Sequence, residues 1–343
     1  MIPRTLDAVE IPGWKEALST AISSPKALSE RLDIPLTAIC SDANQDFKLF
    51  APEPYLQRIE KGNCDDPLLK QILPHHAEMI SPPGYSNDPL AEEHYNTVPG
   101  LIHKYKNRAL LVSGASCAIN CRYCFRRHFP YDENRLSKEQ WLNALDYIRQ
   151  HTELNEVILS GGDPLITNDK QLQWLTKHIS DISHIKRLRI HTRLPVVIPQ
   201  RIDHSLLKWL SDLPLQKVMV LHINHPNEID HAVKSAIYNI KKTGTLILNQ
   251  SVMLAGVNDC AKTLSALSEK LFDAGALPYY IHKLDKIKGA AHFDIPAEKI
   301  QKIYSDLQAD LPGYLVPKLV VEIPHKASKT LFTYNSPTTH LPS

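Results

Sequence analysis

Short apolar runs alternate with longer amphipathic segments along most of the chain after residue 100. The amphipathic segments, such as 138–151, 169–182 and 262–275, repeat apolar residues at helical spacing. Strands that alternate regularly with helices indicate a parallel sheet. The pattern therefore predicts an α/β fold, a partial (β/α)6 TIM-like barrel whose chemistry gathers at the carboxyl ends of its strands. The predicted strands span 108–114, 156–160, 187–192, 217–223, 245–252 and 277–284, with 314–323 as a further candidate.

The first hundred residues follow a different pattern. Segments 14–24 and 66–80 have helical spacing, and the proline-rich stretch 81–90 is typical of an irregular connection. We therefore predict three parts: an N-terminal helical region at 1–100, the barrel at 101–312, and a final strand with a terminal segment at 313–343.

Composition and charge narrow the class of protein. A chain of 343 residues with 43% hydrophobic residues can bury a sizeable core, and a net charge of +2 without a long basic run does not favour nucleic acid as a partner. No apolar stretch approaches the roughly 20 residues of a membrane-spanning helix, and the start MIPRTLDAVEIPGW lacks the apolar core of a signal peptide. Six cysteines, three of them clustered, favour a reducing compartment, so we expect a cytoplasmic protein without a membrane partner.

The cluster Cys117, Cys121 and Cys124 is the strongest chemical signal. Three thiolates suit an iron–sulfur cluster, because iron in such clusters is held by sulfur. A four-iron cluster with three protein ligands would keep one iron open to a small molecule. The alternatives are a zinc site and three unrelated thiols. Zinc usually takes two separated pairs of ligands, and the remaining cysteines are scattered.

Polar motifs follow several of the predicted strands. SGGDP closes the strand that ends at residue 160, and its two glycines would let backbone approach a ligand closely, although the motif alone would be a tight turn. HINHPNE (222–228) and NQS (249–251) place His222, Asn224, His225 and Gln250 near strand ends. A single histidine is more often structural, but convergence of several strands on one rim favours a site.

Taken together, these segments resemble the lysine 2,3-aminomutase family of radical S-adenosylmethionine (SAM) enzymes across nearly the whole chain. The run CRYCFRRHFPY, the segment GAAHF and the short C-terminus are most similar to the branch that forms (R)-β-lysine for elongation factor P. The resemblance implies the radical SAM partial barrel and a [4Fe-4S] cluster on the three cysteines. It also implies SAM contacts at Gly161, Gly162, Asp163, His222 and Gln250.

The family also uses pyridoxal 5′-phosphate (PLP). Its coenzyme lysine lies in a G/S-K-T segment, which corresponds to Lys329 here, whereas residue type alone would leave Lys326 an equal candidate. The terminal segment is therefore expected to carry the PLP lysine. The resemblance places Lys104, Tyr105 and Arg108 near the coenzyme. Arg108 is favoured for the phosphate because a guanidinium offers several directed donors.

For the substrate, L-lysine, the resemblance implies that Arg126 binds the carboxylate and that Asp285 and Glu322 bind the distant ammonium. Each acidic residue taken singly would more often be a surface charge. Glu322 departs from the aspartate of catabolic members. Those members also carry a C-terminal extension whose cysteines bind zinc with a thiol equivalent to Cys260, so here we expect Cys260 to be free and zinc to be absent.

The implied enzyme is an isomerase that forms β-lysine, with R as the expected configuration. A flavodoxin or ferredoxin would supply the electron, a separate ligase would attach the product to elongation factor P, and a homodimer is possible. Three alternatives remain: a catabolic or osmolyte-forming aminomutase, a non-catalytic iron–sulfur electron carrier, and a radical enzyme that modifies nucleic acid. The set of lysine-binding residues argues against the carrier, and the balanced charge argues against the nucleic-acid enzyme.

Overall fold

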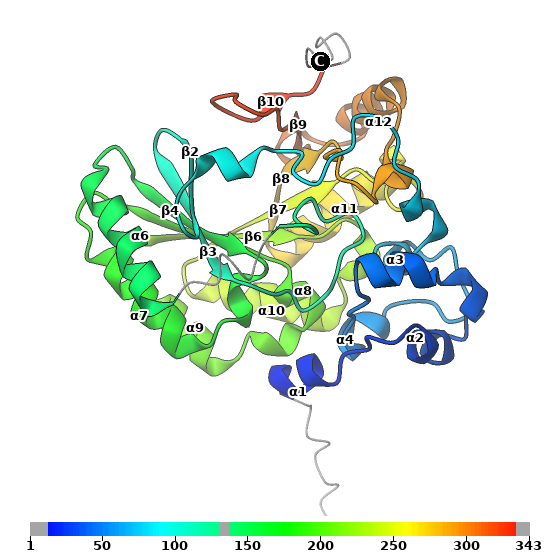
Figure 1. Cartoon of the computed structure of the whole chain (residues 1–343), viewed down its shortest axis with the longest axis horizontal. Coiled ribbons are helices and arrows are strands. Elements are labelled where there is room, and N and C mark those ends of the chain that lie inside the picture. Colours follow the sequence, from blue (N-terminus) through cyan, green and yellow to red (C-terminus); the bar gives the residue numbers. More distant parts are fainter. Residues whose placement is uncertain (1–12, 130–136, 334–343) are drawn as a thin grey trace, which may run out of the picture.

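The computed structural model describes residues 13–129 and 137–333. Its strands form one ten-stranded sheet in which spatial order follows chain order (Figure 1). The strands are β1 Asn96–Val98, β2 Leu101–Tyr105, β3 Arg108–Gly114, β4 Glu156–Gly161, β5 Arg187–Thr192, β6 Gln216–His222, β7 Leu246–Val252, β8 Leu277–His282, β9 Lys318–Val321 and β10 Thr330–Leu331.

The strands from β3 to β9 are parallel, each to the next. β1 and β2 add to one edge and β10 to the other, all antiparallel. Within the described ranges the two edges do not pair with each other, so the sheet is an open, partial barrel. The predicted α/β fold class is confirmed, and the six predicted strands are present with ends shifted by two residues or fewer.

Helices separate the parallel strands. In Figure 1, α6, α7, α9 and α10 follow the outer side of the sheet. Among the described residues, no helix is long and apolar enough to cross a membrane. The helices after residue 100 are α6 Lys138–Gln150, α7 Asp169–Ser180, α8 Leu194–Val197, α9 His204–Asp212, α10 His231–Lys242, α11 Ala261–Ala274 and α12 Ala297–Asp310, with 3-10 turns η4 Pro164–Ile166, η5 Pro199–Arg201, η6 Pro226–Glu228, η7 Ala291–Phe293 and η8 Gly313–Leu315.

The first crossover helix shows why these segments become helical. Ser137 caps α6 by accepting from the backbone N–H of Gln140 at 3.2 Å, and the Gln140 side chain accepts from the backbone N–H of Ser137 at 2.8 Å. Trp141, Leu145 and Ile148 form its buried face against the core. Full burial of each such side chain contributes about 1.5–3 kcal/mol, which fixes the helix on the sheet.

The N-terminal helices are shorter than the spacing predicts. α1 ends at Ser19 because Ile22 instead bridges Ala51, and Ser24 is extended before the proline that opens α2. The segment 66–80 is divided by Pro74, which lacks a backbone donor. The elements are α1 Trp14–Ser19, α2 Pro25–Leu32, η1 Leu36–Ala38, α3 Ser41–Asp46, α4 Glu53–Leu56, α5 Pro67–Lys70, η2 His76–Met79 and η3 Glu92–Tyr95.

The N-terminal region and the barrel share one buried core. Leu28, Leu68 and Ile72 belong to the same apolar cluster as Leu159 and Leu188 of the sheet. The division of the chain into three parts, at 1–100, 101–312 and 313–343, therefore stays a prediction. Strands β1 and β2 were not predicted, because their apolar runs are too short to show an alternation, and they form an antiparallel pair around the turn at Pro99 and Gly100.

The glycines after β4 serve close backbone packing. The N–H of Gly162 donates to the carbonyl of Gly114 at 2.7 Å, and the N–H of Asp163 donates to the carbonyl of Ser116 at 2.8 Å. A Cβ on Gly162 would lie 2.3 Å from the Ser116 oxygen, and Gly161 has a φ of +113°. These glycines thus allow the end of β4 to lie against the chain just before Cys117.

We expect Gly162→Ala to destabilise the protein by about 1–3 kcal/mol, because the added methyl overlaps backbone that cannot rotate away. Urea unfolding of the metal-free protein measures this change. Gly313→Ala is the matched control, because no atom lies within 4 Å of its added Cβ. Equal stability of the two variants would contradict the steric explanation.

Candidate active site

One cavity of about 650 Å³ runs along the inner side of β3 to β8 and past their carboxyl ends. All of the residues to which the family resemblance assigned a role line it, whereas Asn224 and His225, which the strand-end pattern also indicated, do not. Those that line it are Lys104, Tyr105, Arg108, Cys117, Cys121, Cys124, Arg126, Gly161, Gly162, Asp163, His222, Gln250, Asp285, Glu322 and Lys329.

The N-terminal region holds the loop that carries the cysteines. Arg122, between two of them, is fully buried and donates to the Glu78 carboxylate at 2.9 and 2.6 Å and to the Phe47 carbonyl at 2.6 Å. Its backbone N–H donates to the carbonyl of Gln71 at 2.9 Å. Arg127 donates to Glu78 at 3.0 Å. The position of the thiols therefore depends on residues about 40 to 80 positions earlier in the chain.

The three cysteines are free thiols on one side of the cavity. Burial, followed by the neighbouring thiols, raises the pKa of Cys117 and raises the pKa of Cys124 to about 11. No three His, Cys, Asp or Glu side chains in the described parts of the chain are arranged to share a single metal ion. The thiolates of an iron–sulfur cluster bind different irons, so the donor set suits a cluster.

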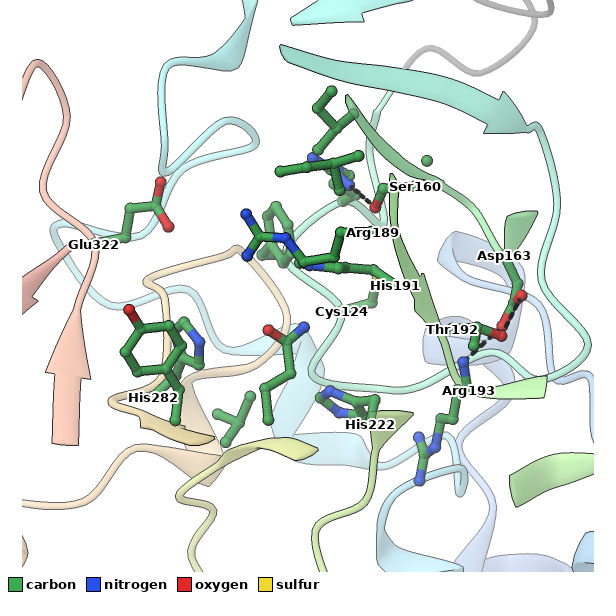
Figure 2. A pocket seen from close by; sticks show the side chains of 18 of the residues that line it. Cys124, Ser160, Asp163, Arg189, His191, Thr192, Arg193, His222, His282 and Glu322 are labelled. Carbon is green, nitrogen blue, oxygen red and sulfur yellow. Dashed lines mark hydrogen bonds between the residues drawn. The ribbon is translucent and has the colours of Figure 1, made fainter. Parts of the chain in front are cut away.

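His222 and Asp163 are both engaged within the protein. The Nε2 of His222 lies 2.9 Å from the Tyr123 hydroxyl, and burial with the nearby Arg193 lowers the pKa of His222 to about 3, so the ring is neutral. Asp163 accepts from the Thr192 hydroxyl at 2.7 Å and from the backbone N–H groups of Arg193 and Leu194 at 2.7 and 2.9 Å (Figure 2). Asp163 thereby joins the end of β4 to the end of β5.

Arg126 forms a nearly buried ion pair with Glu92. Its Nε and Nη2 each lie 2.7 Å from a Glu92 oxygen, and its Nη1 donates to the Ser160 hydroxyl at 3.2 Å. The two charged side chains are 8% and 12% exposed. Two parallel bonds fix the plane of the guanidinium.

Glu322 connects residues that the sequence assigned to different ligands. Its Oε1 accepts from Lys104 and from the Tyr105 hydroxyl, both at 2.8 Å, and its Oε2 is paired with Lys329. Burial alone would raise the pKa of Glu322, but Lys329 and Lys104 outweigh it and hold that pKa well below its usual range. The predicted coenzyme lysine and a predicted substrate carboxylate therefore neutralise each other here.

Arg108 lies beside this group without joining it. Its guanidinium carbon is 4.0 Å from the centre of the Tyr105 ring, and its Nη1 donates to Asn107 at 3.0 Å. Gln250, from β7, lines the cavity between His222 of β6 and His282 of β8 in strand order.

Several residues of the cavity were not predicted as site residues. Figure 2 shows Arg189, His191 and His282 directed into the space between the strands, with Glu322 across from Arg189 and His191. The signal lay in β5, where Arg187, Arg189 and His191 alternate with buried residues. Polar side chains at alternate positions of a strand that is otherwise buried indicate a lined interior. The others missed include Glu92, Glu156, Arg193, Tyr279 and Tyr280.

Comparisons with known proteins give a consistent family. The model of the Radical SAM superfamily matches residues 111–260. The chain is 50% identical over 325 residues to the L-lysine 2,3-aminomutase of Haemophilus influenzae, covering 94% of this chain and 96% of that protein. It is 48% identical over 329 residues to the L-lysine 2,3-aminomutase of Escherichia coli, covering 95% and 96%. The enzyme of that name from Clostridium subterminale is 37% identical over 278 residues, covering 80% and 66%.

We expect Asp285→Asn to stabilise the ligand-free protein at pH 8 by about 1–3 kcal/mol. Burial, followed by the charge of Glu322, raises the pKa of Asp285 to about 7. A carboxyl whose pKa is raised in the folded protein does not lower the free energy of unfolding at a pH where it is protonated in both the folded and the unfolded state. As the pH rises from about 4 to about 7, the carboxyl ionises first in the unfolded protein, so the free energy of unfolding falls. Urea unfolding at pH 4.5 and pH 8 measures the difference.

The control is Asp273→Asn, at an exposed position of α11. It should change stability little at either pH. A gain for Asp285→Asn that is equal at both pH values would contradict the assignment of the raised pKa to Asp285.

Proposed function

The chain belongs to the lysine 2,3-aminomutase family within the radical SAM superfamily, and on this premise we propose that it converts L-lysine to β-lysine. The resemblance noted in the sequence is thereby confirmed, and the chain is a radical SAM isomerase. The observation that carries the proposed reaction is that one cavity brings the three free thiols together with Lys329, Arg126, Asp285 and Glu322. The alternative of an electron carrier gives no reason for the last four groups.

Membership of the superfamily implies a [4Fe-4S] cluster and SAM. When bound, they supply a 5′-deoxyadenosyl radical that can remove a hydrogen atom from C3 of lysine. Cys117, Cys121 and Cys124 would hold three irons of the cluster. His222 and Gln250, with the backbone at Gly161 and Gly162, would border SAM. The neutral ring of His222 is suited to a hydrogen bond that does not add a charge to the site.

The residues present also suit PLP. When bound, PLP supplies the electrophilic carbon that holds the lysine nitrogen as it migrates from C2 to C3. Lys329 offers the amine that would anchor it, and Ser328 and Lys329 line the cavity. Arg108 would bind the phosphate, because Lys104 and Tyr105 are engaged with Glu322. Tyr105 then supports the Arg108 guanidinium through its ring.

Substrate binding would use opposite charges at the two ends of L-lysine. Arg126 would bind the carboxylate, with Glu92 holding the guanidinium plane. Glu322 and Asp285 would bind the distant ammonium. The lysine ammonium can take the position of the Lys329 ammonium on Glu322, so the carboxylate keeps a cationic partner throughout. Fixing both ends aligns C3, and misplacement by about 1 Å can cost a hundredfold in rate.

We further propose that the β-lysine, in the R configuration, modifies elongation factor P in the cytoplasm through a separate ligase. This rests on similarity to that branch of the family. A flavodoxin or ferredoxin would donate the electron, and a homodimer is a possible assembly. The second candidate is production of free β-lysine for lysine catabolism or as an osmolyte. The similarity of the run CRYCFRRHFPY and the segment GAAHF to the elongation factor P branch favours the first.

The anaerobically reconstituted protein should form β-lysine from L-lysine in the presence of SAM, PLP and a strong reductant. Mass spectrometry after chiral derivatisation measures the product. Cys121→Ala and Lys329→Ala should each lower the rate at least about a thousandfold, because each removes a group that holds a reactive cofactor. Lys326→Ala, three residues earlier in the same segment, is the control and should stay active.

Two other outcomes of this assay are informative. Formation of 5′-deoxyadenosine without β-lysine would contradict the assignment of L-lysine as the substrate, but it would still support the radical chemistry. Full activity of Lys329→Ala would contradict the coenzyme assignment.

In the source organism, deletion of the gene should leave elongation factor P without its β-lysyl group. Intact-mass analysis of purified elongation factor P measures this, and only active protein should restore the modification. Unchanged elongation factor P together with loss of free β-lysine would instead support the second candidate.

A further inference from the structure

Arg193, directly after β5, is a buried guanidinium that the proposed reaction does not use. It is 7% exposed, and its Nη1 lies 2.6 Å from the sulfur of Cys121 and 2.7 Å from the Tyr123 hydroxyl. Its Nη2 donates to Gln71 and to Glu228, each at 2.7 Å. The sequence carries no local sign of this contact, because 72 positions separate the arginine from the cysteine.

We propose that Arg193 is a positioning residue that binds the sulfur of Cys121 and raises the reduction potential of the cluster held by that cysteine. The inference rests on the proposed cluster ligands and adds a determinant of their redox chemistry. Hydrogen bonds to cluster sulfurs and nearby net charge are among the factors that set such potentials.

The surroundings hold this guanidinium in place from both ends. Its backbone N–H donates to Asp163 at 2.7 Å, so the start of the side chain is tied to the end of β4. The fully buried Glu228 carboxylate accepts a hydrogen bond from Nη2 of Arg193 and another from the backbone N–H of Asn224 at 2.8 Å. A buried cation with one carboxylate partner and a fixed backbone cannot turn toward solvent, so it stays directed at Cys121.

The direction of the effect follows from charge. Reduction transfers one electron from an external donor to the cluster and adds one negative charge beside the guanidinium, with no proton moved. A buried positive charge favours the more negative state, because electrostatic interactions strengthen away from water. Removing that charge should therefore make the cluster harder to reduce.

Two variants separate this effect from loss of structure. Arg193→Gln combined with Glu228→Gln removes both buried charges, so that no carboxylate is left unpaired. The guanidinium contacts the Cys121 sulfur through Nη1, whereas Glu228 binds the other terminal nitrogen, Nη2, so loss of the nearer positive charge outweighs loss of the negative one. Arg193→Lys keeps the charge but loses the planar fork. Arg201→Lys is the matched control, because Arg201 is also buried on the same connection but donates to the Leu165 carbonyl and pairs with Asp169.

The midpoint potential of the reconstituted cluster is measured by anaerobic redox titration with EPR, without lysine or PLP. The double variant should show a ratio of reduced to oxidised cluster at least tenfold lower than the wild type at the same solution potential, which corresponds to 59 mV. Arg193→Lys should shift less, and Arg201→Lys should not shift. An unchanged potential in a double variant with full iron and sulfide content would overturn the proposal.

A second measurement needs no variant. In wild-type protein labelled with ¹⁵N in its arginine guanidinium groups, pulsed EPR of the reduced cluster should detect a nitrogen at hydrogen-bond distance. Absence of that coupling would overturn the proposed contact between Arg193 and the sulfur of Cys121. Because the measurement uses the wild-type protein, it can be made even if every variant loses its cluster. A wild-type protein that holds no cluster would instead contradict the proposed function, so the two failures are distinguishable.

Discussion

The buried ion pair between Arg122 and Glu78 is the interaction on which the rest of the site depends. Arg122 lies between two cysteines of the loop, and its pairing with Glu78 joins that loop to the N-terminal region. There Arg122 also donates to the carbonyls of Ala43 and Phe47. Removing one partner of such a pair leaves an uncompensated buried charge and typically costs about 3–5 kcal/mol. The N-terminal helices, which contribute few side chains to the cavity, therefore determine where the thiols stand relative to the strands.

Several charged groups in the cavity are paired before any ligand is present. Arg126 is paired with Glu92, and Glu322 with Lys104 and Lys329. Partly buried charges without partners would be costly. Binding of a zwitterionic substrate would thus exchange one cationic or anionic partner for another. This arrangement explains how a cavity with so many ionised side chains can be built into the inner side of a parallel sheet.

The barrel strands could be predicted from the sequence because a parallel sheet buried on both faces gives apolar runs separated by amphipathic helices. The N-terminal region was less predictable. Helical spacing near Ile22 and Pro74 suggested longer helices, but a bridge to Ala51 and the missing donor of proline end them early. Strands β1 and β2 are too short to show a period, although they carry Lys104 and Tyr105 to the edge of the cavity.

The sequence by itself determined the alternation of strands and helices, the local spacing of Cys117, Cys121 and Cys124, and the motifs that indicate the family. Each of these is a relation between residues close in the chain. Only the tertiary structure decided that Glu92 pairs with Arg126, that Lys329 is held by Glu322 beside Lys104, and that Arg193 reaches Cys121. The physical reason is that charge pairing depends on distance in space, and apart from the pair of Glu322 and Lys329 these partners come from different strands and loops that meet only when the sheet forms.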